Sequence, residues 1–212
     1  MKDIQRIEPD RACQYIASLL KVPTETFRRY YSMFSTVKPT GENSNWSMPE
    51  AEARLLYAIT RTTKPSIVLE YGTHLGYSTT YFREALNHNE HGVVVTLDRK
   101  QHHNGLPRLT SSYRVIPLTT DGVEFSKTLC FPVDLIFEDS SHQEDNTRQF
   151  LTNCLPWLSP GGIVLVHDIC FPGYGEGVTR GMAGALGDNI ERLIISNSPC
   201  GLGLWIKPLL SD

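Results

Sequence analysis

Beyond Pro65 the chain alternates between short apolar runs and amphipathic stretches. Apolar runs of this length predict strands buried on both faces of a parallel sheet, and the stretches between them predict crossover helices. Two final runs are joined by a link too short for a parallel crossover, which predicts an antiparallel hairpin. The five expected parallel strands are 66–70, 93–97, 113–117, 133–137 and 163–166, and the hairpin strands are 192–196 and 202–206. The pattern therefore predicts an α/β fold with a seven-stranded mixed sheet between helices.

Helical spacing of apolar residues predicts the helices of this fold. The clearest spans 143–158, where Phe150, Leu151, Cys154, Leu155 and Leu158 form one stripe. Apolar residues within 11–31 recur in the same way and predict an N-terminal extension of one or two amphipathic helices.

Turn-forming residues over 37–46 predict a loop between this extension and the rest of the chain. Ser47 and Glu50 then have the spacing of a capping box and predict the start of the next helix. We therefore expect an N-terminal helical cap and linker over residues 1–46 and the main domain over 47–212.

Composition and charge restrict the function further. The length of 212 residues suits one hydrophobic core, and a net charge of −3 without a basic run disfavours nucleic acid as a partner. No apolar stretch approaches the roughly 20 residues that span a bilayer, so no membrane partner is expected. The N-terminus lacks the features of a secretory signal, and five scattered cysteines fit buried thiols. These features predict a cytoplasmic protein.

A glycine-containing turn follows the first core strand. Glu70 precedes Gly72, and Gly76 and Ser78 follow in the pattern G-x-x-x-G-x-S, where a ligand can approach the main chain closely. A dinucleotide fingerprint would need glycine at the position of His74. The turn therefore favours a ligand with an amino-acid portion over a diphosphate such as that of NAD.

Acidic and histidine side chains follow the next strands. Asp98 lies at the end of its strand, where its carboxylate can accept hydrogen bonds from both hydroxyls of a ribose. Asp121 could accept from an adenine amino group or cap the following helix, and the sequence leaves both open. Asp139 and His142 follow one strand, and His167 with Asp168 follows the next. The carboxyl ends of parallel strands share one edge, so we expect these groups in the same crevice as the turn.

Together these segments resemble the class I S-adenosylmethionine-dependent methyltransferases, most closely the catechol and caffeoyl-CoA type O-methyltransferases and related enzymes of antibiotic pathways. The resemblance covers about residues 47–207 and implies a Rossmann-like methyltransferase domain, hence a transferase of the 2.1.1 class in small-molecule metabolism. It rests on the order of the glycine turn, Asp98, the strand before Asp139, residues 158–162 before His167, and residues 201–207.

The resemblance also implies roles for individual residues. Glu70 would bind the cofactor as part of the turn motif, and Asp139 would lie beside the methyl-bearing sulfonium. Asp98 would bind the ribose and Asp121 the adenine. In the catechol-type enzymes, aspartates matching Asp139 and Asp168 hold Mg²⁺. An Asn usually follows the second aspartate, and Ile169 stands there in this chain. The expected contacts to the methionine end of the cofactor are Gly72, Thr73, Gly76 and Ser78.

His142 stands where the catechol enzymes carry the lysine that takes the acceptor proton. Histidine titrates near neutrality, so His142, or in second place His167, is the expected general base. We therefore expect methyl transfer to a hydroxyl of a small-molecule acceptor. The glycine-rich segment 171–178 could be a flap or a surface loop, and the N-terminal helices could cover the pocket or form a homodimer contact.

Two other functions are compatible with this pattern. The first is a cofactor-binding member of the fold without methyl transfer, which catalyses another reaction or senses the cofactor. The second is an NAD(P)-dependent oxidoreductase, which the side chain of His74 disfavours.

Overall fold

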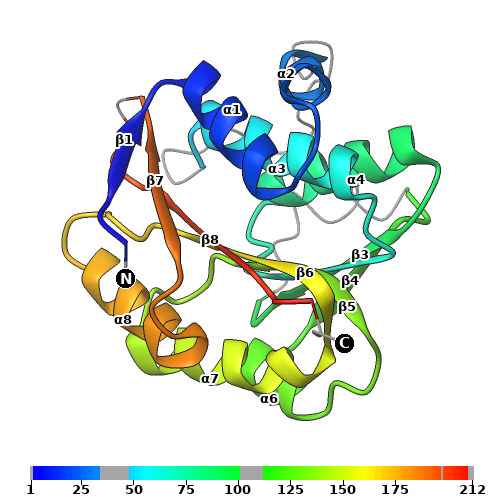
Figure 1. Ribbon diagram of the computed structural model, residues 1–212. Helices are drawn as coiled ribbons and strands as arrows, with labels where there is room; N and C mark the ends of the chain where they lie inside the picture. Colours follow the sequence, from blue (N-terminus) through cyan, green and yellow to red (C-terminus); the bar gives the residue numbers. More distant parts are fainter. Residues whose placement is uncertain (1, 34–47, 101–111, 197, 210–212) are drawn as a thin grey trace.

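A twisted eight-stranded sheet forms the centre of the molecule. The computed structural model describes residues 2–33, 48–100, 112–196 and 198–209. The sheet lies between two layers of helices (Figure 1). Its strands are β1 Gln5–Ile7, β2 Ile67–Tyr71, β3 Val93–Asp98, β4 Val115–Thr119, β5 Val133–Glu138, β6 Leu158–His167, β7 Glu191–Ile195 and β8 Leu202–Ile206.

The strand order is β1-β7-β8-β6-β5-β2-β3-β4. Strands β4, β3, β2, β5 and β6 are parallel, and β8 runs antiparallel to both β6 and β7. The five parallel strands and the C-terminal hairpin are therefore confirmed.

The expected number of seven strands is wrong, because β1 adds an eighth. It pairs in parallel with β7, with Gln5 opposite Leu193 and Ile7 opposite Ile195. Three residues are too few to show a period of two, so only the pairing partner identifies this strand. The N-terminal extension is thus not purely helical.

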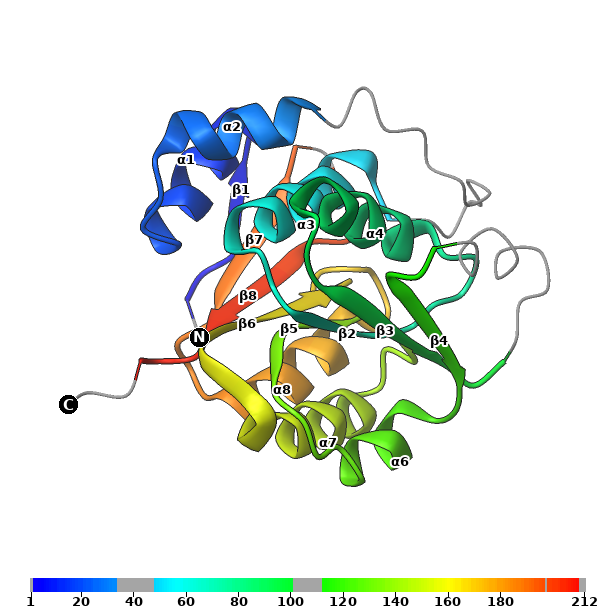
Figure 2. The same cartoon turned by 90° about the vertical axis from the view of Figure 1, so that its right-hand side faces the viewer.

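Helices cover both faces of the sheet (Figures 1 and 2). Helices α1 to α4 pack over one face, and α6 to α8 pack over the other. Their bounds are α1 Pro9–Leu19, α2 Thr24–Met33, α3 Glu50–Thr63, α4 Tyr77–Asn89, α6 Gly122–Lys127, α7 Glu144–Cys154 and α8 Gly175–Leu186, and a 3-10 turn spans Leu155–Trp157. No helix in the described ranges is long and apolar enough to span a membrane.

Alternate strand residues divide the core into two halves. Val68 of β2 belongs to the cluster beneath α1 to α4, whereas its neighbour Leu69 belongs to the cluster above α6 to α8. This alternation is expected for a sheet covered on both faces. The same alternation determines which side chains at the strand ends reach the edge of the sheet.

Two helix bounds differ from the sequence expectation. Helix α3 begins at Glu50 with Pro49 as its N-cap, so the capping box from Ser47 is wrong. Helix α7 ends at Cys154, and Leu158 already belongs to β6. Residues 37–46 and Ser47 lie outside the described residues, so the domain boundary between 46 and 47 stays a prediction.

Candidate active site

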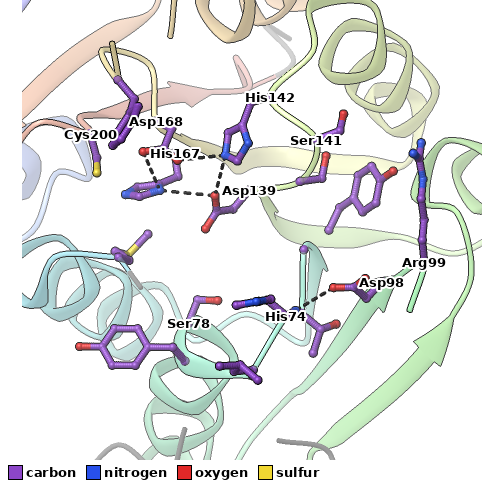
Figure 3. A pocket seen from close by; sticks show the side chains of 18 of the residues that line it. His74, Ser78, Asp98, Arg99, Asp139, Ser141, His142, His167, Asp168 and Cys200 are labelled. Atoms are coloured by element: carbon purple, nitrogen blue, oxygen red, sulfur yellow. Dashed lines mark hydrogen bonds and ion pairs between the residues drawn. The ribbon is translucent and has the colours of Figure 1, made fainter. Parts of the chain in front are cut away.

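A cavity of about 730 Å³ lies at the carboxyl ends of β2, β3, β5 and β6. The turn after β2 and the end of β3 form one side of it, and the ends of β5 and β6 form the other (Figure 3). The expected crevice at this edge of the sheet is therefore present.

The turn after β2 lines this cavity at Gly72, Thr73 and Ser78, whereas Gly76 lies outside the lining. Gly72 has φ 114°, and a Cβ atom there would lie 2.0 Å from the carbonyl oxygen of Asp139. Gly76 has φ 77° and forms the N-cap of α4. Both positions therefore need glycine, one for close packing against the strand end after β5 and one for a left-handed backbone.

Glu70 lies behind the turn and outside the cavity lining. It is fully buried and accepts hydrogen bonds from the hydroxyls of Ser78 (2.6 Å) and Thr79. Burial raises the pKa of Glu70 to about 7, although these hydroxyls oppose the shift. The side chain of Glu70 thus holds the start of α4 in place.

Two acids expected at the nucleoside have different positions. Asp98 lines the cavity and accepts from the backbone N–H of His74 (2.7 Å) and of Lys100 (3.0 Å). Asp121 instead caps α6 by accepting from two backbone N–H groups, and it pairs with Arg99 at 2.6 Å. Asp121 does not line the cavity, which favours its alternative role as an N-cap.

Four side chains expected at the strand ends come together at the opposite side of the cavity. His142 Nε2 lies 2.9 Å from Asp168 Oδ2 and 3.5 Å from Asp139 Oδ1. His167 Nδ1 lies 3.4 Å from Asp139 Oδ1 and 3.5 Å from Asp168 Oδ1. The four groups thus form a closed ring of contacts (Figure 3).

The charges of this ring are strongly coupled. Burial alone would lower the pKa of His142, but its contacts with Asp139 and Asp168 raise that pKa to about 9. Burial would likewise lower the pKa of His167, and the same two carboxylates raise it well above its ordinary value. The pKa values of Asp139 and Asp168 are lowered by the two imidazoles, against the effect of burial. The ring therefore favours positive charge between the two carboxylates.

A family model described as a methyltransferase domain matches residues 69–169, which include the glycine turn, Asp98 and all four members of the ring. Residues 69–169 carry a methyltransferase domain. The predicted family and enzyme class are thereby confirmed.

Several solved structures share the fold of this chain. They include a methyltransferase from Podospora anserina bound to S-adenosylhomocysteine, with 20% identity, full coverage of both chains and a TM-score of 0.65. The O-methyltransferase TomG from Streptomyces achromogenes, solved with S-adenosylmethionine, has 20% identity, a TM-score of 0.64 and coverage of 95% of this chain and 99% of its own. An O-methyltransferase from Bacillus cereus has 17% identity, a TM-score of 0.63 and coverage of 93% and 97%. No curated protein sequence matches the chain significantly.

Sequence reasoning missed two residues behind the ring of this methyltransferase domain. Glu52 of α3 is fully buried and accepts from His167 Nε2 at 2.8 Å, and Cys200 lines the cavity next to the same imidazole. Glu52 shares a helix face with Leu55, Leu56 and Ile59. A carboxylate on an apolar helix face was the available signal, because buried carboxylates need a partner.

An aromatic wall completes the cavity of the methyltransferase domain. Phe171 and Tyr174 stack with ring centroids 4.7 Å apart, and Tyr174 also contacts His142 at 4.5 Å. Both lie in the segment 171–178, which is a loop up to Tyr174 and helix α8 from Gly175. The role of this segment as a flap stays a prediction.

Proposed function

We propose that this protein transfers the methyl group of S-adenosylmethionine to a hydroxyl oxygen of a small-molecule acceptor. The observation that carries the proposal is the position of the two groups of residues in one cavity. The glycine turn and Asp98 lie at one side, and the ring of acids and histidines lies at the other (Figure 3). Two reactants held at these sides would meet in a fixed orientation, which is a large source of rate acceleration.

The first side suits the cofactor. Gly72, Thr73, Gly76 and Ser78 would hold its methionine portion through the turn, and Asp98 would accept from the ribose hydroxyls. The Asp98 carboxylate has lone pairs left after its two backbone contacts. Glu70 would act by holding the turn, and Asp121 by fixing α6 below it.

The second side suits the acceptor. S-adenosylmethionine supplies an electrophilic methyl group when bound. Its transfer to the acceptor oxygen would release S-adenosylhomocysteine, and a neutral imidazole of the ring would take the hydroxyl proton. His142 is better placed than His167, because His167 is only 3% exposed and its Nε2 is held by Glu52. Only neutral His142 can accept the proton, and its pKa of about 9 means that this form increases as the pH rises toward 9. The products are S-adenosylhomocysteine, a methyl ether and a proton.

The residues present also fit a divalent cation. Asp139 and Asp168 have ligand atoms that lie, together with one of His142, within 4.8 Å of one another. Several of the ring's buried polar atoms have no hydrogen-bond partner, namely His142 Nε2, His167 Nδ1 and Asp168 Oδ1. A cation held by Asp139 and Asp168 would polarise the acceptor oxygen. Ile169, which is 2% exposed and apolar, offers no ligand in place of the Asn of the catechol-type enzymes.

The test separates cofactor binding from proton removal. We expect His142→Ala to bind S-adenosylhomocysteine as the wild type does, and to lose about a hundredfold or more in kcat with a hydroxylated acceptor. Calorimetry measures the binding, and formation of S-adenosylhomocysteine measures turnover. His91→Ala, which changes an exposed histidine outside the cavity lining, serves as the control. A protein that binds the cofactor but forms no S-adenosylhomocysteine with any hydroxylated acceptor would be a member of the fold without methyl transfer.

A further inference from the structure

The side chain of His167 has an unpartnered nitrogen in a buried position. Its side chain is 3% exposed, and Nδ1 points between the carboxylates of Asp139 and Asp168 without a hydrogen bond to either. An imidazole nitrogen buried among acceptor oxygens is costly unless it donates a proton of its own to them or binds a cation. Asp168 Oδ1, which faces the same point, is also buried and unpartnered.

The opposite nitrogen of this imidazole is fixed by Glu52. Nε2 donates to Glu52 Oε2 at 2.8 Å, and the other oxygen of Glu52 accepts from the backbone N–H of Gly201 at 3.1 Å. With one proton held at Nε2, loss of the proton at Nδ1 leaves the lone pair of the neutral ring there, so that a cation can replace the positive charge that the two carboxylates favour. Histidines that bind metals usually donate their second nitrogen to a carboxylate or carbonyl in this way. Glu52 thus prepares His167 as a ligand.

The distances from His167 Nδ1 to the two carboxylates help to distinguish a bound proton from a bound metal ion. Nδ1 lies 3.4 Å from Asp139 Oδ1 and 3.5 Å from Asp168 Oδ1. An N–H···O hydrogen bond would bring these atoms to about 2.7–3.2 Å. Ligand atoms about 2.1 Å from one metal ion lie roughly 3.0–3.4 Å apart at octahedral to tetrahedral angles. The spacing and the missing hydrogen bonds are thus closer to those of a metal site.

We propose that His167 Nδ1, Asp139 and Asp168 bind a first-row transition metal ion, and that this site prefers Co²⁺ or Zn²⁺ to Mg²⁺. His167, immediately before Asp168, would thereby replace the amide ligand that is missing at Ile169. Imidazole nitrogen suits transition ions, whereas Mg²⁺ prefers oxygen ligands and water. His142 pairs with the other oxygen of Asp168 and stays available as the base. The role of the ion at the acceptor rests on the function proposed above, but the site itself does not.

The experiment measures metal binding without cofactor or acceptor, so its result is independent of methyl transfer. Co²⁺ and Mg²⁺ are titrated separately into the metal-free protein, with calorimetry for affinity and visible absorption for Co²⁺ coordination. We expect one Co²⁺ per chain, bound at least about tenfold more tightly than Mg²⁺.

His167→Ala tests the ligand directly. We expect it to weaken Co²⁺ binding by about tenfold or more and to change Mg²⁺ binding much less, so that the preference for Co²⁺ falls. Asp139→Asn should weaken both ions, and His91→Ala should change neither. Equal Co²⁺ affinity in the wild type and His167→Ala, or an equal loss for both ions in that variant, overturns the proposal.

Two measurements keep the test valid if His167→Ala does not fold. Glu52→Gln removes the charge behind His167 and should weaken Co²⁺ binding by about tenfold. Pulsed electron paramagnetic resonance of the Cu²⁺-loaded wild type should show nitrogen coupling from a bound imidazole, and this coupling should persist in His142→Ala. Loss of the coupling in His142→Ala would assign the nitrogen to His142 and overturn the proposal.

Discussion

Three non-glycine residues beside the cavity adopt positive φ angles: His74 at 43°, and His142 and Asp168 at 58° each. Such backbone is costly for residues with a Cβ and persists where the surrounding structure holds it. At Asp168 it ends the alternation of β6, so that this carboxylate and the preceding His167 reach the same ring (Figure 3). The strained residues thus bring the chemical groups together.

At the scale of single residues, Asp98 and Asp121 form a matched pair, because each accepts from two backbone N–H groups but only Asp98 lines the cavity. We expect Asp98→Ala to weaken binding of S-adenosylhomocysteine by roughly tenfold or more, since hydrogen bonds to charged groups contribute about 1.5–3 kcal/mol. Asp121→Ala should lose about 1 kcal/mol of stability as an N-cap and keep its affinity. Calorimetry and urea unfolding provide the two measurements. Equal affinity in the wild type and Asp98→Ala contradicts the proposed ribose contact.

Glu70 makes stability depend on pH. Its folded-state pKa of about 7 lies above the ordinary value of 4.5, so the folded protein keeps a proton that the unfolded chain releases between these values. As the pH rises from about 4.5 to about 7, the wild type should lose about 3 kcal/mol of unfolding free energy relative to Glu70→Gln, and no more above that range. Urea unfolding of both proteins across this range measures the difference. A difference that does not change with pH would show that Glu70 is ionised throughout.

At the scale of elements, the turn between β2 and α4 depends on Gly72. We expect Gly72→Ala to lower the unfolding free energy by about 3 kcal/mol or more, since a Cβ there adds a backbone clash to the strain of positive φ. Gly173→Ala is the control, because Gly173 has φ 98° but nothing within 4 Å of its Cβ position. That variant isolates the strain, expected at about 1–2 kcal/mol. Equal losses in urea unfolding would show that the contact with Asp139 is unimportant.

The edge strand β4 shows where element prediction from sequence fails. The expected strand was 113–117, whereas the observed one is Val115–Thr119. Of these five residues only Val115 is buried, because β4 pairs on one side alone. The interior strand β3 is buried along most of its length, and its expected start at Val93 is confirmed. The bounds of a buried strand can be predicted from its own run of apolar residues. The bounds of an edge strand depend on where the neighbouring strand pairs with it.

At the scale of the whole molecule, the N-terminal extension shares the core of the methyltransferase domain. Phe27 of α2 is 0% exposed and belongs to one cluster with residues of α3, α4 and the sheet. Strand β1 extends the sheet beside β7 (Figure 1). Glu191 of β7 accepts a hydrogen bond from Tyr15 of α1. We infer that the extension and the sheet fold as one unit.

Unfolding should therefore be a single cooperative transition. We expect Phe27→Ala to lower the free energy of unfolding by about 3–5 kcal/mol and to shift this same transition, because it leaves a cavity in the shared core. Circular dichroism and tryptophan fluorescence during urea unfolding provide two probes. Two separate transitions, with only the first shifted in the variant, would indicate that the extension is a domain of its own.

The amino-acid sequence by itself determined the alternation of strands and helices, the glycine turn and the acids and histidines at the strand ends. These are local patterns, because burial imposes its period on neighbouring residues and tight turns need glycine. Only the tertiary structure decided that β1 joins the sheet, that Asp121 caps a helix and that Glu52 holds His167. Glu52 and His167 are 115 positions apart. Contacts over such separations leave no local pattern, because they are set by how the helices pack on the sheet.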